Sequence, residues 1–526
     1  MSGIRDLLGE AISHPMLVLG SILVLLLTYP LTTALYNLFL HPLHRFPGPL
    51  LYAASPYPWA IRHALGTSAF HTERLHARYG PVVRIGPNHL SFTSPAAWRD
   101  AYNALPPRPG NKAHGHWSWP EMPKSKTFTS ATDDQETSIL QAEYYEHGRL
   151  RRALAPGFAD AALKRWTGPG GTLKVHVDLL VEKLKGKCRG DEGSQGGEGT
   201  VLDMEKWYGW TMFDIGGELV WGRTFGCLDK EEYHPWVDFL MGTLKAAAAM
   251  VSIIYLGGRG LVRILFNTVG QKSIETLRKM TEEILTYRLG MEEGRVDLFE
   301  GLLKHRDEWN LSFEKLSTSG LVMTMGGSET LASSLSGTTY LLLENPSTWK
   351  KLAEEVRTAF TNADDITVKA TAQLPYLTAV INEGFRMYPP VVADLVRVVP
   401  PEGKEIAGHF IAGGALVEVQ PWSANHSADN WVDPWTFNPD RFLVSEEEAR
   451  AAGNIFEASQ IFSYGPRNCL GRNLAYAEMR LILARLVFEF DMELQDDSHD
   501  WIMQQKTYPL WDRLPLNVHI KPVMRN

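Results

Sequence analysis

The stretch Phe462-Ser463-Tyr464-Gly465-Pro466-Arg467-Asn468-Cys469-Leu470-Gly471 decides the fold of this chain. Two glycines and a proline predict a tight turn, and the amphipathic run from Leu474 to Phe490 predicts a helix directly after it. A cysteine in such a turn lies near a helix N-terminus, where backbone N–H groups and the helix dipole favour a thiolate. Cys469 is therefore a candidate metal ligand, and Arg467 can meet an anionic group with its planar fork.

The spacing F-x-x-G-x-R-x-C-x-G resembles the signature of the cytochrome P450 family, especially its microsomal enzymes from filamentous fungi, such as the benzoate and isotrichodermin hydroxylases. The resemblance covers nearly the whole chain, from the N-terminus to the tail around Trp511. It implies the cytochrome P450 fold, a single large helical domain around heme b. It also implies Cys469 as the axial iron ligand, with Phe462 and Arg467 beside the heme. A thiolate ligand donates electron density to iron, which favours cleavage of the O–O bond of dioxygen.

Composition and charge narrow the possible classes of protein. The chain has 526 residues, 44% hydrophobic and 21% charged, with a net charge of -8, which fits a large globular enzyme and argues against a nucleic-acid partner. Its three cysteines form no C-x-x-C pair, which excludes a zinc ribbon, and their number argues against a disulfide scaffold.

Hydrophobic periodicity predicts a mainly α fold with a minor β region. Short strands are expected at 82–85 and 416–419, and an exposed loop at 186–200. The expected helices cover residues 147–154, 173–185, 204–220, 235–250, 273–289, 313–343, 346–360, 377–387 and 474–490.

The N-terminus predicts a membrane anchor. Residues 15–36 carry no charge, and about 20 apolar residues suffice for a helix that crosses a bilayer. A cleaved signal peptide fits less well, because Asp6 and Glu10 weaken the basic start and the apolar run is too long. We expect a short segment 1–14, a transmembrane anchor 15–40, a proline-rich elbow 41–50 and a catalytic domain 51–526. That domain would face the cytosol from the endoplasmic reticulum membrane.

The expected helix 313–343 contains Gly326-Gly327-Ser328-Glu329-Thr330. Two consecutive glycines in a helix cost about 2 kcal/mol relative to alanine, which a flat ligand against the backbone would explain. Thr330 can donate its hydroxyl to a preceding carbonyl, and Glu329 could relay protons. The stretch resembles the family's A/G-G-x-D/E-T-T motif, which implies that Glu329 and Thr330 deliver protons to bound oxygen. Leu331 departs from that motif, where a second threonine is usual.

Two further sets of charged residues have family counterparts. Glu383 and Arg386 lie on one helix face in apolar surroundings, and with Arg441 they resemble the E-x-x-R and P-E-R-F network, which is structural. Asp440 replaces the usual glutamate of that network. By resemblance, His147, Arg151 and Arg397 are candidate contacts for the heme propionates, although a solvated basic face is the plain alternative for the first two.

The chain contains no flavin or nicotinamide fingerprint and no iron–sulfur cysteine set, so electrons must come from another protein. The resemblance implies NADPH–cytochrome P450 reductase, with cytochrome b5 as a further donor. The family layout implies a pocket for a hydrophobic substrate, lined by 114–128, 246–256, Met323, 391–395 and 507–509, in which Asp394 and Tyr508 are polar candidates.

The expected reaction inserts one oxygen atom from dioxygen into a small molecule of secondary metabolism, most simply as a hydroxylation. Epoxidation, desaturation and oxidative ring coupling are the alternatives within the family. A membrane-tethered heme carrier or sensor without turnover is the alternative of another class.

Overall fold

A computed structural model describes residues 15–104, 121–129, 138–168, 170–189, 199–268, 270–291, 295, 297–392, 395–508 and 510–524. Some expected features lie outside these residues: the segment 1–14, residues 114–120 of the substrate loop, Asp394 and Pro509.

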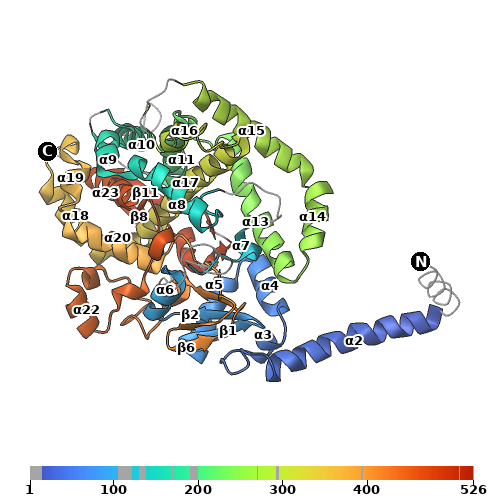
Figure 1. Cartoon of the computed structure of the whole chain (residues 1–526). Coiled ribbons are helices and arrows are strands. Elements are labelled where there is room, and N and C mark those ends of the chain that lie inside the picture. Colours follow the sequence, from blue (N-terminus) through green and yellow to red (C-terminus); the bar gives the residue numbers. More distant parts are fainter. Residues whose placement is uncertain are drawn as a thin grey trace, which may run out of the picture.

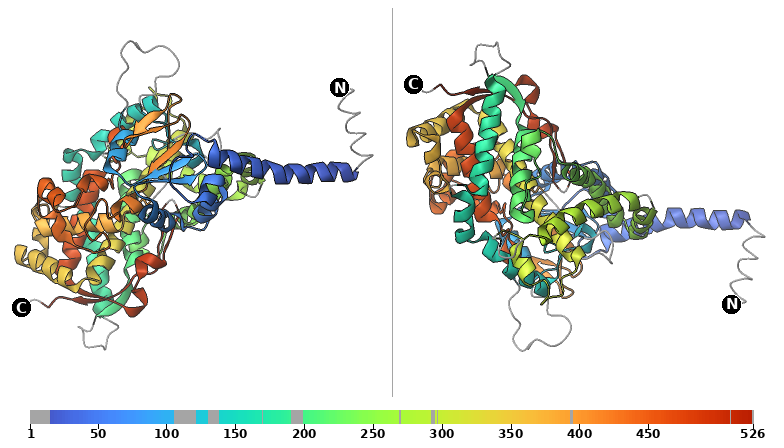
Figure 2. Two further views of the ribbon diagram at one scale, coloured as in Figure 1. Left: turned by 90° about the horizontal axis from the view of Figure 1, so that it is seen from below. Right: turned by 90° about the horizontal axis from the view of Figure 1, so that it is seen from above.

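The N-terminal helix α2 (Pro15–Phe39) projects away from the rest of the molecule (Figures 1 and 2). It has 25 residues, contains Pro30 and carries no charged side chain. Its last turn is tied to the body, because Asn37 donates to the carbonyl of Ala54 at 2.9 Å and its own carbonyl accepts from Arg84 at 2.9 Å. A helix is thus present over the segment for which the sequence predicted an anchor.

The body is mainly helical, as predicted, and the long helix at 313–343 has the predicted bounds. The sequence missed several helices of the first hundred residues and α14, where the apolar pattern is short or broken. The expected loop at 186–200 was partly wrong, because α10 continues to Arg189 and a strand begins at Thr200. The helices of eight or more residues in the body are α4 (Tyr57–Ala64), α5 (Ser68–Tyr79), α6 (Pro95–Tyr102), α8 (Tyr144–Leu154), α9 (Asp160–Thr167), α10 (Thr172–Arg189), α11 (Met204–Trp221), α13 (Pro235–Tyr255), α14 (Arg259–Thr268), α15 (Gln271–Leu289), α17 (Phe313–Leu343), α18 (Pro346–Ala359), α20 (Pro375–Met387) and α23 (Arg472–Glu489).

Shorter helices connect these elements. They are α3 (Leu50–Ala54), α7 (Lys126–Thr129), α12 (Cys227–Lys230), α16 (Glu300–Lys304), α19 (Val368–Thr371), α21 (Pro421–Asn425), α22 (Glu446–Ala451) and α24 (Trp501–Gln504), with six short 3₁₀ turns: η1 (Ala155–Phe158), η2 (Ala363–Asp365), η3 (Pro439–Phe442), η4 (Phe456–Ala458), η5 (Gly465–Arg467) and η6 (Asp496–Ser498).

The helix α17 runs through the core, where its close neighbours approach it at glycines. A Cβ on Gly320 would overlap the ring of Trp221 in α11, and one on Gly337 would overlap Tyr388, directly after α20. Such close packing of backbones requires residues without side chains, since protein interiors have almost no free volume. The central position of α17 fixes the site described below (Figure 1).

The β region is small. One mixed sheet has the order β1-β2-β7-β4, in which β2 pairs with β7 in parallel and the other pairs are antiparallel. An antiparallel sheet has the order β3-β11-β8, and two hairpins complete the set. The strands are β1 (Val82–Gly86), β2 (His89–Phe92), β3 (Thr200–Asp203), β4 (Arg397–Val398), β5 (Lys404–Ile406), β6 (His409–Ile411), β7 (Leu416–Val419), β8 (Phe490–Leu494), β9 (Lys506–Thr507), β10 (Trp511–Asp512) and β11 (Asn517–Pro522).

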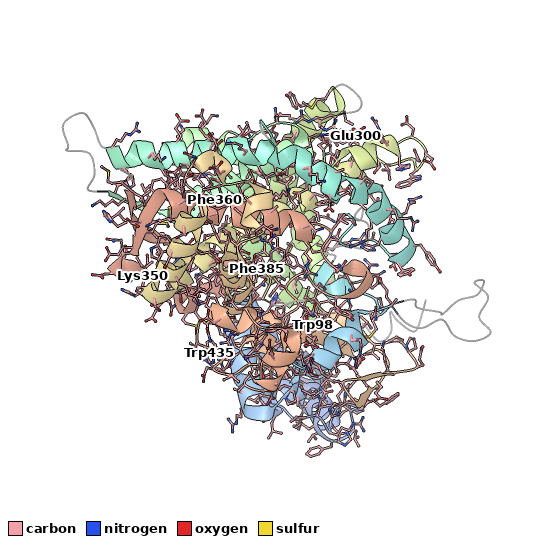
Figure 3. All side chains as sticks on the ribbon, turned by 90° about the vertical axis from the view of Figure 1, so that its left-hand side faces the viewer. Trp98, Glu300, Lys350, Phe360, Phe385 and Trp435 are labelled. Atoms are coloured by element: carbon pink, nitrogen blue, oxygen red, sulfur yellow. The ribbon has the colours of Figure 1, made fainter. Side chains whose placement is uncertain are left out.

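Two small apolar clusters lie on opposite faces of the mixed sheet. Val82, Leu90 and Val417 pack on one side of it with Trp98, while Val83 and Ile85 pack on the other side with Trp59. This alternation follows from the two-residue period of a strand. The main core fills the helical part, where Phe385 lies deep in the molecule (Figure 3).

Candidate active site

The loop around Cys469 is closed by its own backbone. The N–H of Cys469 donates to the carbonyl of Phe462 at 2.7 Å, and η5 forms the turn between them. Gly465 has φ +74°, and a Cβ there would overlap the carbonyl oxygen of Tyr102 at the end of α6. Only glycine fits this left-handed and crowded position. The loop predicted from the sequence is therefore shaped by a contact with α6 as well as by its own residues.

The ring of Phe462 anchors the loop to the core. It packs edge-on against Phe385 of α20, with 5.5 Å between ring centroids, and also contacts Tyr476 of α23 at 5.5 Å. The guanidinium of Arg472 lies over its other side at 5.7 Å. Phe462 thus fixes where the start of α23 lies relative to α20.

Cys469 differs from the other two thiols in its accessibility. Cys188 and Cys227 are buried, whereas Cys469 is exposed, three residues before the first residue of α23. Although the residue as a whole is exposed, protein atoms surround much of its sulfur, and this burial raises the pKa of the Cys469 thiol. The N–H of Gly471 and the charge of Arg151 oppose that rise. The sequence had suggested that the helix N-terminus favours a thiolate here. The helix N-terminus alone does not make the free thiol acidic. Coordination by a metal ion would deprotonate it.

Basic side chains gather beside this loop. The pKa of His147 is lowered to about 3, first by burial and then by the charges of Arg467, Lys124, Arg151 and Arg397. His147 is consequently neutral near pH 7, so that it can serve an anionic ligand as an N–H donor but not as a cation. The structure thus brings together the four basic residues that the sequence had singled out, which are His147, Arg151, Arg397 and Arg467.

Lys124 belongs to this cluster, and the sequence analysis missed it. The segment around it pairs with β4. Lys124 and Arg397 form an isolated antiparallel bridge, and the N–H of Ser125 donates to the carbonyl of Val396 at 3.1 Å. Its ammonium donates to the carbonyl of Leu140 at 2.7 Å, and burial with the charges of Arg397 and Arg467 lowers its pKa to about 7. Nothing local in the sequence signals an added strand of this kind, because its partner lies far along the chain.

Arg467 and Arg151 have protein partners of their own. The Nε of Arg467 donates to the Glu121 carboxylate at 2.5 Å, and its Nη1 donates to the carbonyl of Ala142 at 2.8 Å. Arg151 donates to the backbone and side-chain oxygens of Asn468, both at 2.6 Å. Arg151 therefore clamps the residue next to Cys469. The second oxygen of Glu121 is buried, and no described residue gives it a hydrogen bond.

One face of α17 is open at two glycines. A Cβ added to Gly326 or Gly327 would meet no atom within 4 Å outside the helix itself, although most of the helix is packed. The hydroxyl of Thr330 donates to the carbonyl of Gly326 at 2.7 Å, as the sequence predicted. This bond competes with the backbone hydrogen bond of the helix at the Gly326 carbonyl. It lies on the turn of α17 that is open at the two glycines.

Glu329 points into the protein. Its side chain is fully buried, and its carboxylate contacts Arg513, which precedes β11. A proton relay through Glu329, as the sequence predicted, would therefore have to reach solvent through neighbouring residues. The sequence did not single out Arg513, because the two residues are 184 positions apart.

The charged residues of α20 form a closed network. Arg386 donates to both oxygens of Glu383, at 2.7 and 2.8 Å, and Arg441 donates to the same carboxylate at 3.1 Å. All three are buried, and the two guanidinium groups also donate to backbone carbonyls between Val432 and Thr436. Asp440 lies outside the network and pairs with the exposed Lys351.

These features fit heme b. Among the residues that the structure describes, no group of three or more His, Cys, Asp or Glu could hold a bare metal ion. One accessible thiol instead suits an iron whose other ligands come from a macrocycle. The open glycine face of α17 suits a flat group, and the excess positive charge around His147 suits its carboxylates.

A family model described as Cytochrome P450 matches residues 58–518. The chain belongs to the cytochrome P450 family. Cytochrome P450 monooxygenase tpeC of Talaromyces stipitatus is 39% identical to it over 500 residues, which cover 95% of this chain and 94% of the relative. An averantin hydroxylase of Dothistroma septosporum is 36% identical over 94% of this chain and 90% of the relative. A cytochrome P450 monooxygenase of Purpureocillium lilacinum, lcsI, is also 36% identical, over 96% of this chain and 94% of the relative.

This cytochrome P450 is accordingly a heme-thiolate monooxygenase of the type found in fungal secondary metabolism, and it uses heme b, dioxygen, a small-molecule substrate and a redox partner. The fold class, the cofactor and the reaction class predicted from the sequence are confirmed. Of the described helices, α13 is long and apolar enough to cross a membrane, but a core helix of a soluble protein can pass the same test.

Proposed function

We propose that Cys469 ligates the heme iron of this enzyme and that the reaction is hydroxylation of a hydrophobic small molecule. The observation that carries the proposal is the single accessible thiol, held in a loop by Phe462 and Arg151 at the start of α23. Heme bound by a thiolate supplies the binding of dioxygen and the cleavage of its O–O bond. The averantin hydroxylase relative supports hydroxylation over epoxidation, desaturation or ring coupling.

The residues around the heme would hold and orient it. Lys124, Arg397 and Arg467 supply positive charge, and neutral His147 supplies an N–H donor, for the two propionates. Arg151 acts one step removed, through Asn468, by keeping the Cys469 loop in place. Glu383, Arg386 and Arg441 hold the segment 432–441 against α20 and are structural.

Thr330 and Glu329 would handle protons. The Thr330 hydroxyl lies on the turn of α17 that is open at Gly326, so that it can hold a proton close to bound oxygen. Glu329 is the adjacent carboxylic acid, and burial raises its pKa, which favours its protonated form.

The carbon monoxide difference spectrum of the reduced enzyme tests the iron ligand. We expect the Soret band of a thiolate-ligated heme for the wild type and for the matched control Cys188→Ala, whose cysteine is buried elsewhere. Cys469→Ala should lose this band together with the oxygenation of substrate. A histidine-type band in the wild type, or an unchanged band in Cys469→Ala, would refute the proposal.

The hydroxylation is tested with isotopically labelled dioxygen. One labelled oxygen atom in the product, present as a new alcohol O–H with every C=C bond of the substrate retained, supports it, because an epoxide has the same mass but has lost a C=C bond. A product without label would instead identify desaturation or ring coupling.

We further propose that residues 15–40 anchor the enzyme in the endoplasmic reticulum membrane by one pass, with the body in the cytosol. The length and the uncharged sequence of α2 support this, as do exposed apolar side chains on the elements next to it. In α3 and α4 these include Leu50, Leu51, Tyr57 and Ile61. Figure 1 shows α14, whose Ile264 is also exposed, on the same side of the body as the base of α2. Exposed apolar side chains close to the base of α2 suit contact with lipid.

NADPH–cytochrome P450 reductase is the proposed electron donor, with cytochrome b5 as a second one. Arg152 of α8 and Arg472 of α23 are exposed on elements that meet at the Cys469 loop, and an acidic flavoprotein would be steered to such charge. Rates of heme reduction should therefore fall with rising ionic strength, and more steeply in the wild type than in Arg152→Gln.

A further inference from the structure

A buried cluster of charges lies where α17 meets the start of α11 and the C-terminal segment. Arg513 contacts both carboxylate oxygens of Glu329, one through Nη1 and the other through Nη2 at 3.1 Å. On its other side it donates to one oxygen of Glu205, from Nε at 2.9 Å and from Nη2 at 2.7 Å. Nη1 also donates to Ser333, one turn after Glu329, at 2.7 Å.

The cluster holds one more negative than positive charge. Two carboxylates share one guanidinium. The other titratable groups that face it are Tyr233 and Tyr388. Both are neutral near pH 7, since tyrosine titrates near pH 10 and burial raises their pKa values well above that. A buried group with unbalanced charge lowers its free energy by binding a proton. Burial raises the pKa of Glu329, the charge of Arg513 opposes this, and the charge of Glu205 adds to it.

The cluster also connects the interior with the surface. The side chain of Glu329 is 0% exposed, that of Arg513 is 3% exposed, and that of Glu205 is 14% exposed. Glu205 is in the first turn of α11, next to Lys206, whose side chain is half-exposed. At the other end, Glu329 directly precedes Thr330 on the open turn of α17. Among the described residues of the cluster, Glu205 is thus the carboxylate that water can reach.

We propose that Glu205 and Arg513 are positioning residues for proton delivery: Arg513 fixes the carboxyl of Glu329 beside Thr330, and Glu205 is where the proton enters from solvent. A hydronium ion protonates the Glu205 carboxylate. The new O–H bond then breaks as the proton passes to the Glu329 carboxylate, and Glu205 is left charged again. Arg513 keeps its charge throughout. This inference rests on the role proposed above for Glu329 and Thr330.

An infrared titration of the ferric holoenzyme tests it. The band of a protonated buried carboxyl should be present in the wild type and absent in Glu329→Gln, which identifies it. Glu205→Gln removes a neighbouring negative charge and should move the midpoint of this band to lower pH, by about one pH unit. Arg513→Gln removes the positive charge and should move it to higher pH. Opposite shifts would show that both charges act directly on the Glu329 carboxyl.

Turnover gives the second readout. Glu205→Gln should lower the amount of product formed per NADPH consumed several-fold and increase the solvent isotope effect. The matched control is Glu314→Gln, which removes an exposed glutamate from the first turn of α17. If Arg513→Gln does not fold, Glu205→Gln still carries the test, because it leaves the Glu329–Arg513 pair intact with balanced charge.

Different results would refute the role of Glu205 and Arg513 and the role of Glu329 and Thr330. If Glu205→Gln keeps the wild-type midpoint and coupling while Glu329→Gln and Thr330→Ala impair turnover, the role of Glu205 and Arg513 is wrong and that of Glu329 stands. If Glu329→Gln and Thr330→Ala also keep wild-type coupling, the proposed proton delivery itself is wrong.

Discussion

At the scale of single residues, the site combines groups whose protonation is set by burial and by neighbouring charge. Burial, and then the charges of neighbouring basic side chains, lower the pKa of His147, while burial raises the pKa of Glu329 and the charge of Arg513 opposes that rise. Neither state can be read from the residue type. An isolated histidine or glutamate would titrate near its ordinary pKa, so the reactivity of these residues belongs to the cluster in which each lies.

Thr330→Ala should keep the heme and lose efficiency. The change removes the hydroxyl on the open turn of α17 that would hold a proton there, so that more of the electrons from NADPH should leave as peroxide and fewer should enter the product. We expect product per NADPH consumed to fall by about tenfold to a hundredfold, while peroxide rises. Parallel assays of product, NADPH and peroxide measure this.

Thr318→Ala provides the matched control, because Thr318 makes the same bond to the carbonyl four residues earlier, at 2.7 Å, on an exposed part of α17. Equal coupling of wild type and Thr330→Ala would contradict the proposed role.

At the scale of elements, the fold depends on helices that approach α17 at glycines. Gly320 faces the ring of Trp221, and Gly384 of α20 faces Thr338. Single-sequence periodicity identifies these helices well, because the apolar repeat of 3.6 residues is local. It does not identify which glycine faces which neighbour, since that depends on how two helices cross.

Gly320→Ala should therefore destabilise the enzyme although alanine favours helices. The added methyl group overlaps the Trp221 ring, and overpacking of this kind costs about 1–3 kcal/mol. Denaturant unfolding followed by circular dichroism measures the change. Gly242→Ala in α13 is the control: its Cβ meets no atom within 4 Å, so this variant should be as stable as the wild type or more so. Equal stability of the two variants would show that α11 and α17 are less tightly packed than described.

At the scale of the whole molecule, α2 stands apart from the body except at its last turn. Deleting residues 2–30 should release the enzyme from membranes and leave its carbon monoxide spectrum unchanged. Deleting residues 2–40 also removes Asn37, which bonds to Ala54 and Arg84, and should lower the melting temperature. Membrane fractionation and thermal melts compare the two. If the variant that lacks residues 2–30 stayed in the membrane fraction, this would show that the body itself binds lipid strongly.

Buried neutral histidines should make the whole fold sensitive to acid. Burial lowers the pKa of His426 to about 3 and that of His76 to about 4, whereas the unfolded chain has pKa values near 6.5. Between these values the unfolded state binds more protons, so stability falls as pH drops below 6.5. Each such histidine should cost about 2 kcal/mol at pH 5.

His426→Gln should flatten the pH dependence of the unfolding free energy between pH 6.5 and 4.5. An exposed histidine, His409, offers the control in His409→Gln, which should leave the slope unchanged. The same slope in both variants would show that His426 does not contribute to acid unfolding.

The sequence by itself determined the features that local interactions create. The turn before α23, the accessible Cys469, the long helix α17 and the bond from Thr330 to the carbonyl four residues earlier all follow from hydrogen bonds and side-chain periods that span a few residues. Asn345 shows the limit of such reasoning: asparagine favours the N-cap position that it occupies before α18, but its side-chain amide donates to the carbonyl of Leu341 and does not accept from the helix.

Only the tertiary structure decided which charges meet. Glu329 and Arg513 are 184 residues apart, and Glu121 and Arg467 are 346 apart. Ion pairs over such separations depend on how helices and strands pack, and packing depends on the shapes of many side chains at once. The sequence therefore specified the thiol and its loop, while the fold specified the charges that surround them and the protonation of Glu329.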